Sequence, residues 1–152
     1  MFDLVIKIHP YDLEQGVDSY STANLTINGK NGSLTSKREE PPYQDMMIFI
    51  SISELLDKVV QLVKNQAKDY QFNGVDSSFV FNISNRNGTF YVKDSKHNLI
   101  AECTPVDLVK SIWLGVSKIV NKYRPFLEND DGVTKDLDMS IKEFKTEFSN
   151  IL

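Results

Sequence analysis

Few residues in this chain belong to the types that carry out chemistry. Two histidines, His9 and His97, and one cysteine, Cys103, are its only imidazole and thiol groups. His97, Glu102 and Cys103 could in principle form a metal or nucleophile set, but their spacing matches no familiar site. We therefore expect no catalytic residues and no metal site. His9 is expected at an exposed strand end and Cys103 in the core, where unpaired cysteines are common.

The sequence also lacks the loops that bind phosphates and calcium. Its seven glycines are scattered, and none forms G-x-G-x-x-G or the phosphate loop of nucleotide-binding enzymes. The stretch 128–132, Glu-Asn-Asp-Asp-Gly, is acidic like a calcium loop. An EF-hand places its first aspartate five residues before the glycine, where this chain has Leu127. We expect no cofactor and interpret this stretch as a solvated loop between helices.

Composition excludes several classes of partner. The chain has 152 residues, of which 41% are hydrophobic and 25% charged, as is typical of one globular domain. Its net charge is −4, and its one basic pair, Lys37-Arg38, is followed at once by Glu39-Glu40. A nucleic-acid partner is not expected, because binders of nucleic acid usually have a clustered basic face. Since no run of 18 apolar residues and no signal peptide is visible, we expect no membrane partner and a cytoplasmic protein.

The elements that must position any site alternate between strands and helices. Period-two alternation and tight-turn residues predict antiparallel strands near residues 2–8, 23–27, 33–36, 46–50, 79–83, 90–92 and 99–103. The stretches 11–20 and 69–77 are polar and are interpreted as connections. If Asn87 and Gly88 form a hairpin turn, Ile83 lies opposite Val92.

Helical periodicity predicts three helices. Ser51 and Glu54 have the spacing of a capping box before an amphipathic helix of about 14 residues. Thr104-Pro105 begins a second helix, which should end before Pro125. A third is predicted over 139–150. The fold class is therefore α+β, with an antiparallel meander sheet of about six or seven strands, two main helices on one face and a C-terminal helix. We expect a single domain over 1–152, in which 125–152 is an appended loop and helix.

Over residues 2–124 this order resembles a family of small bacterial immunity proteins, which neutralise polymorphic or wall-associated toxins of Gram-positive bacteria. The resemblance lies in the early hairpin strands, the Met46–Ser51 strand entering the Leu55-Leu56 helix, the Phe-rich meander and the helix from Val109 to Tyr123. It implies a protein without chemistry of its own, which binds one cognate toxin and covers its active site or locks its fold. The family's toxin-facing residues vary, so the resemblance assigns none here.

Many such toxins carry basic grooves, and an acidic patch would speed association with them by electrostatic steering. We hypothesise that the densest acidic cluster in the sequence faces a basic toxin domain. The next densest cluster is Glu39-Glu40. That first cluster consists of Glu128, Asp130, Asp131, Asp136 and Asp138.

Two other function classes remain open. A small-ligand-binding or enzymatic domain would need a concave pocket on the sheet with several convergent polar groups. A self-assembling structural subunit would need an exposed apolar patch, for which Phe144, Phe148 and Ile151 are candidates. The oligomeric state is not predicted.

Overall fold

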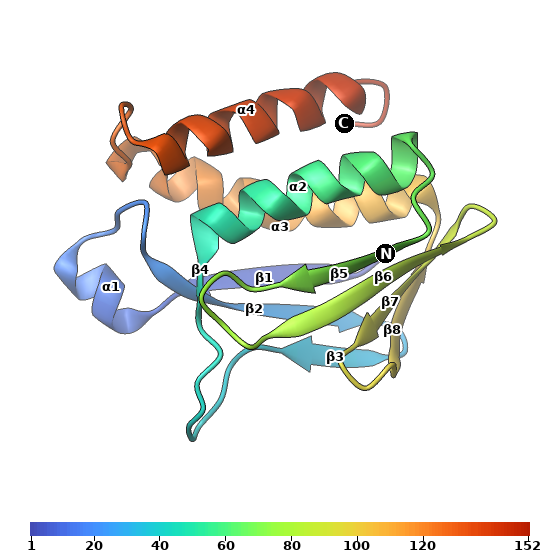
Figure 1. Ribbon diagram of the computed structural model, residues 1–152, viewed down its shortest axis with the longest axis horizontal. Coiled ribbons are helices and arrows are strands. Elements are labelled where there is room, and N and C mark those ends of the chain that lie inside the picture. The colour runs from blue at the N-terminus through green and yellow to red at the C-terminus, as the bar shows by residue number, and fades with distance from the viewer.

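The computed structural model describes residues 1–152 and has an α+β fold with four helices and two antiparallel sheets (Figure 1). The strands are β1 (Asp3–Ile8), β2 (Thr22–Gly29), β3 (Gly32–Thr35), β4 (Met46–Met47), β5 (Asp69–Asn73), β6 (Val80–Arg86), β7 (Thr89–Asp94) and β8 (Leu99–Cys103). The helices are α1 (Pro10–Gln15), α2 (Ile48–Lys64), α3 (Pro105–Tyr123) and α4 (Gly132–Glu147), with a 3-10 turn η1 (Arg124–Phe126) before α4.

The α+β class and the antiparallel pairing are confirmed, whereas the single sheet of six or seven strands is wrong. Each sheet has four strands: β1-β2-β3 with β4 also paired to β2, and β5-β6-β7-β8. The chain leaves the first sheet at β4, which is two residues long, and crosses through α2 to the second sheet. Where the sheets meet, the Asn31 amide donates to the Ile100 carbonyl over 3.0 Å, and Gly29 packs on the Ile100 backbone. Inside the second sheet Ile83 pairs with Val92, as expected from a hairpin turn at Asn87 and Gly88.

The polar stretches 11–20 and 69–77 are not connections throughout. The first contains α1, which has no buried residue and therefore leaves no apolar periodicity to detect. The second contains β5, where Tyr70 and Phe72 point inward between polar neighbours. Two apolar positions indicate a five-residue strand only weakly, and the neighbouring Asn73-Gly74 pair is typical of a turn.

The sequence predicts the start of α3 correctly but not the start of α2. The Ser51 capping box is wrong, because α2 begins at Ile48 and takes in residues assigned to a strand. The Ser51 hydroxyl instead donates to the Met47 carbonyl over 2.8 Å and accepts from the Val75 amide over 3.0 Å. Helix α3 behaves as predicted: Thr104 accepts from the Asp107 amide over 3.1 Å, and the helix ends at Tyr123.

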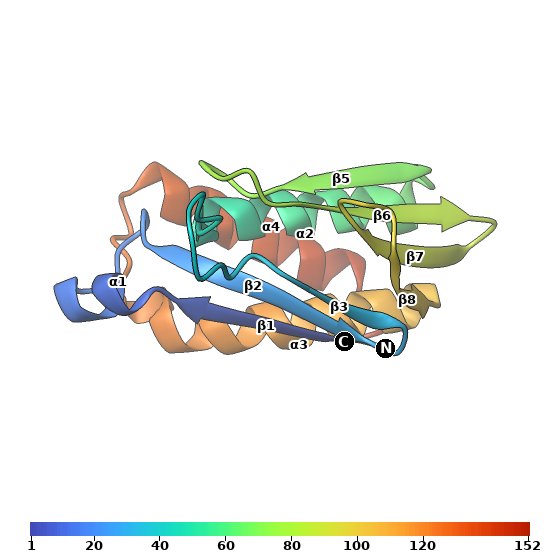
Figure 2. The same ribbon diagram turned by 90° about the horizontal axis from the view of Figure 1, so that it is seen from below.

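Helices α2, α3 and α4 form two layers on one face of the sheets. Helices α2 and α3 lie against the strands, and α4 lies on the outer side of α2, so that three layers are stacked (Figure 1). The opposite face of the sheets carries no helix, as the view from below shows (Figure 2). One cluster of 36 buried hydrophobic side chains fills the interior. None of the helices is both long and apolar enough to cross a membrane.

Helix α4 begins at Gly132, seven residues before the predicted start, because Asp131 caps it. Phe144 on this helix and Phe148 at its C-cap are fully buried, and the Phe144 ring stacks on Trp113 with centroids 5.7 Å apart. Ile151 is partly buried against the same core. The apolar patch that a self-assembling subunit would need at these three residues is therefore not exposed.

Candidate functional site

The candidate set of His97, Glu102 and Cys103 does not form a metal site. Cys103 is buried, as expected, and burial raises the pKa of its thiol to about 11. A thiol with that pKa is almost entirely protonated at neutral pH and is a poor nucleophile. His97 is exposed in the β7–β8 turn, with φ +65°. No three His, Cys, Asp or Glu side chains are grouped so that they could hold a metal ion.

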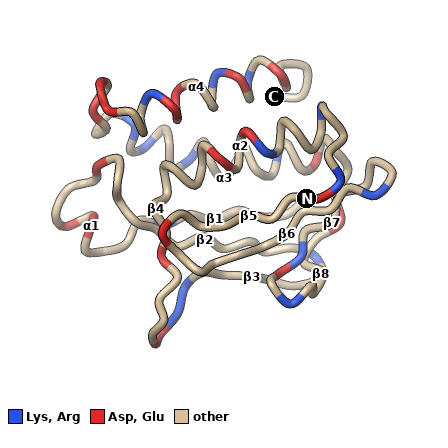
Figure 3. Tube along the Cα trace, viewed as in Figure 1, with Lys and Arg blue, Asp and Glu red and all other residues tan.

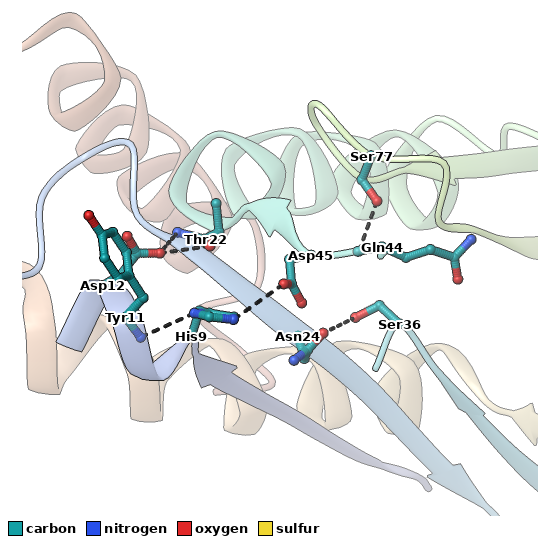
Figure 4. Close-up of polar contacts among 9 residues, drawn as sticks. All are labelled: His9, Tyr11, Asp12, Thr22, Asn24, Ser36, Gln44, Asp45 and Ser77. Atoms are coloured by element: carbon teal, nitrogen blue, oxygen red, sulfur yellow. Dashed lines mark hydrogen bonds and ion pairs between the residues drawn. The ribbon is translucent and has the colours of Figure 1, made fainter. Parts of the chain in front are cut away.

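His9 belongs to a group of polar contacts at the base of α1 (Figure 4). It is partly buried rather than fully exposed, and its Nδ1 accepts from the Tyr11 amide over 3.1 Å, capping α1. Its Nε2 lies 3.8 Å from the Asp45 carboxylate. Asp12 accepts from the Thr22 amide over 2.9 Å and from the Thr22 hydroxyl over 2.7 Å. These contacts fix α1 against the start of β2.

Ser36, which Figure 4 also shows, has separate partners. Its hydroxyl donates to the Asn24 side-chain oxygen over 3.3 Å and accepts from the Leu25 amide over 2.8 Å, and the residue is fully buried. On the other side, the Ser77 hydroxyl donates to the Gln44 carbonyl over 2.8 Å. The imidazole thus caps α1, whereas the Ser36 hydroxyl holds the end of β3 against β2.

The structure divides the predicted acidic cluster among three places. Glu128 and Asp130 are exposed in the loop before α4, where Asp131 caps the helix. Asp136 lies on the side of α4 that faces α2. Asp138 is paired with Arg124. The cluster is dense in sequence but does not form one surface.

Asp138 holds the α3–α4 connection in place. The Arg124 guanidinium donates two hydrogen bonds of 2.8 Å to its carboxylate, and donates to the Asn129 side-chain oxygen over 2.8 Å. It also donates to the Leu127 carbonyl over 3.3 Å. The hydrogen bond to Asp138 raises the pKa of the guanidinium. This carboxylate already has a partner within the chain.

Asp131 joins two parts of the chain that are far apart in sequence. Its carboxylate accepts from the Val133 amide over 2.8 Å, and the Ser19 hydroxyl donates to it over 2.6 Å. The Ser19 hydrogen bond is the main reason that the pKa of Asp131 is below its usual value, and the Val133 amide adds to the effect. The loop between α1 and β2 is thereby attached to the start of α4.

This attachment joins two acidic segments at one end of the molecule, which we name the α1 end and define as residues 10–21 together with 126–131. Both ribbon views place α1 and the α3–α4 connection at the same end of the molecule (Figures 1 and 2). Segments 10–21 and 127–131 each carry three carboxylates and no lysine or arginine. In Figure 3 acidic residues mark both segments. Large exposed apolar side chains lie among them, namely Tyr11 at 63%, Leu13 at 48%, Tyr20 at 56% and Phe126 at 64% exposure.

A second acidic surface lies between α2 and α4, as a groove of about 840 Å³. Its carboxylates are Glu54, Asp57, Asp136, Glu143 and Glu147. Two lysines, Lys58 and Lys142, also line it. We name this surface the α2–α4 groove.

Most residues of the α1 end and of the α2–α4 groove were not predicted from the sequence. The apolar residues of α1 are scattered through a polar stretch, and nothing in the sequence places that stretch beside residues 126–131. The groove combines the solvent-facing sides of two helices that are about 80 residues apart in the chain. A periodic pattern shows that a helix has a polar side, but not which other helix lies next to it.

Comparison with protein-family models, with curated proteins and with solved structures gave no match.

If the Ser19 hydrogen bond lowers the pKa of Asp131, removing that bond should change the titration of Asp131. Replacing Ser19 by alanine should raise the pKa of Asp131 towards the ordinary value near 3.8, as measured by the NMR shift of its carboxyl carbon. Because the folded pKa is the lower one, this carboxylate stabilises the fold above the unfolded pKa and loses that effect as pH falls through the folded pKa. Stability below about pH 4 should therefore depend less on pH in Ser19→Ala.

Ser33→Ala serves as the control, because the Ser33 hydroxyl donates to Asn28 on the first sheet and not to Asp131. The same Asp131 titration midpoint in both variants and in the parent would contradict the assignment.

Proposed function

We propose that this chain is a non-enzymatic protein-binding module of the immunity type, which binds a basic bacterial toxin domain through the α1 end and covers the toxin's active site. The observation that carries the proposal is the juxtaposition of two acidic segments and four exposed apolar side chains by the Ser19–Asp131 hydrogen bond. The proposal places the protein in the cytoplasm, where it would protect the cell that makes it.

The composition of the α1 end suits protein recognition. Exposed tyrosine and phenylalanine are enriched at protein interfaces, where they bury large areas with few rotatable bonds. Tyrosine rings also attract arginine and lysine side chains through their π faces. Since Glu14, Asp18, Glu128 and Asp130 have no ion-pair partner within the chain, their field is available to a basic partner.

The α1 end is also held in one geometry before any partner arrives. Asp12 attaches α1 to Thr22, Asp131 attaches the α1–β2 loop to α4, and Arg124 attaches the α3–α4 connection to Asp138. A surface that is ordered in advance loses less conformational entropy on binding.

Charge reversal tests the proposal. Glu128→Lys combined with Asp130→Lys should weaken association with the partner by about tenfold or more, mainly through a slower on-rate at low salt. Neither side chain caps a helix or pairs with another residue, so the thermal unfolding midpoint should stay close to that of the parent. The partner is first captured with the tagged chain from its own producer at moderate salt, identified by mass spectrometry, and then titrated as a purified domain.

The matched control reverses two exposed carboxylates on the open face of the sheets, Asp3 and Glu102. Equal affinities of the parent and of the Glu128/Asp130 variant would reject the α1 end as the contact surface. Recovery of this chain alone, from a lysate shown to contain a basic toxin domain, would reject the immunity function itself.

A further inference from the structure

The α2–α4 groove has an excess of uncompensated negative charge. Five carboxylates and two ammonium groups line it, and none of these seven side chains takes part in an ion pair within the protein. Carboxylates that line one groove repel one another, and a bound cationic group would relieve that repulsion. The groove therefore has the charge that complements a basic segment.

The groove also contains features that a solvated helical surface does not require. Met139 lines the groove and is 70% exposed, and Ile50 is the other apolar residue of the lining. Ser140 lines the groove with only 6% of its surface exposed, and its hydroxyl has no hydrogen-bond partner in the protein. Because this hydroxyl opens on the groove, water or a polar group of a bound partner can hydrogen-bond to it. Met139 has a flexible, polarizable side chain that adapts to an apolar partner surface.

From these features we propose that the α2–α4 groove binds a basic amphipathic helix of a protein partner. The apolar side of that helix would pack on Met139 and Ile50, and its lysines or arginines would face the carboxylates on α2 and α4. Packing an amphipathic helix into a groove between two helices is a recurrent mode of peptide recognition. The groove shares no residue with the α1 end, so the inference stands or falls independently of the proposed function.

A synthetic peptide tests the inference with the intact chain. The probe is a peptide of about 16 residues, the length of α4, with leucine on one helical side and lysine on the other, labelled for fluorescence anisotropy. We expect binding in the micromolar range at about 0.1 M salt, weakening as salt rises. A scrambled peptide of the same composition, which has no apolar side, should bind at least about tenfold more weakly.

The matched variants locate the binding. Asp57→Asn with Glu143→Gln removes two groove charges without breaking an ion pair, and should weaken peptide binding by about tenfold. Asp3→Asn with Glu102→Gln removes the same charge from the open sheet face and should change binding by less than about twofold. Circular dichroism and thermal unfolding of both variants verify that each is folded.

Four results would overturn the inference. Equal losses in the two double variants would show attraction to net charge alone, and equal binding of the scrambled peptide would exclude recognition of an amphipathic helix. A dimer of this chain that Asp57→Asn with Glu143→Gln abolishes would assign the groove to a second copy. Failure of the peptide while a toxin domain still binds the α1 end would reject the groove and leave the proposed function intact.

Discussion

Replacing Gly115 by alanine should destabilise the protein by about 2 kcal/mol, although alanine is the better helix former. A β-carbon at position 115 would lie 2.6 Å from the Leu4 carbonyl oxygen and 2.6 Å from the Leu4 β-carbon. Rotation of a side chain cannot relieve contact with a backbone oxygen, so α3 must move away from β1. Overpacking of this kind costs about 1–3 kcal/mol or more, which outweighs the gain of about 1 kcal/mol in helix propensity.

The measurement is urea unfolding followed by circular dichroism, with Gly132→Ala as the control. Gly132 is the first residue of α4, has no left-handed φ and would place its β-carbon in open space. Alanine there should be neutral or stabilise by about 0.5 kcal/mol. If Gly115→Ala is as stable as Gly132→Ala, then α3 and β1 are not in the close contact described.

What the sequence predicts well are features whose causes are local. The start of α3 at Thr104-Pro105 and the Ile83–Val92 pair each depend on a few adjacent residues with fixed conformational preferences. Local rules fail where a residue has a distant partner. Ser51 has the spacing of a cap, but its hydroxyl accepts from Val75, and the helix begins three residues earlier.

The division into two sheets has a similar explanation. Both sheets consist of antiparallel strands with inward apolar positions, and alternation within a strand does not reveal which sheet it joins. The chain changes sheets after Met46–Met47, where the first sheet gains only two residue pairs. A short run of apolar residues from Met46 to Ile50 predicts a longer strand, but the buried side of α2 uses Ile48 and Phe49 instead.

The acidic site could be predicted only in part, because density along the sequence is not density in space. Glu128 and Asp130 remain exposed and available, whereas Asp131 and Asp138 are bound within the chain. The spacing of these acidic residues does not reveal which of them are bound, because the partners of Asp131 and Asp138 lie in other segments. Those partners are Ser19 and Arg124. The carboxylates that share the groove with Asp136 are Glu54 and Asp57 on α2 and Glu143 and Glu147 farther along α4.

Replacing Phe144 by alanine should have the largest effect on stability, a loss of about 3–5 kcal/mol. The ring is fully buried, stacks on Trp113 at 5.7 Å and meets Phe148 edge-on with centroids 4.8 Å apart. Its removal leaves a cavity between α4 and α3 that two rigid aromatic neighbours cannot easily fill. Since small domains are stable by only about 5–15 kcal/mol, such a loss would bring unfolding close to ambient conditions.

Trp113 is the only tryptophan, so its fluorescence reports directly on the packing of α4. Urea unfolding of Phe144→Ala should show coincident transitions by tryptophan fluorescence and by circular dichroism, because α4 buries Phe144 and Phe148 in the same core as the sheets. The control is Phe126→Ala, which removes an equal side chain that is 64% exposed and should cost about 0.5 kcal/mol or less. A fluorescence transition at much lower urea than the circular dichroism transition would instead make α4 a separately unfolding element. Equal stabilities of the Phe144 and Phe126 variants would contradict the packing of α4 on the core.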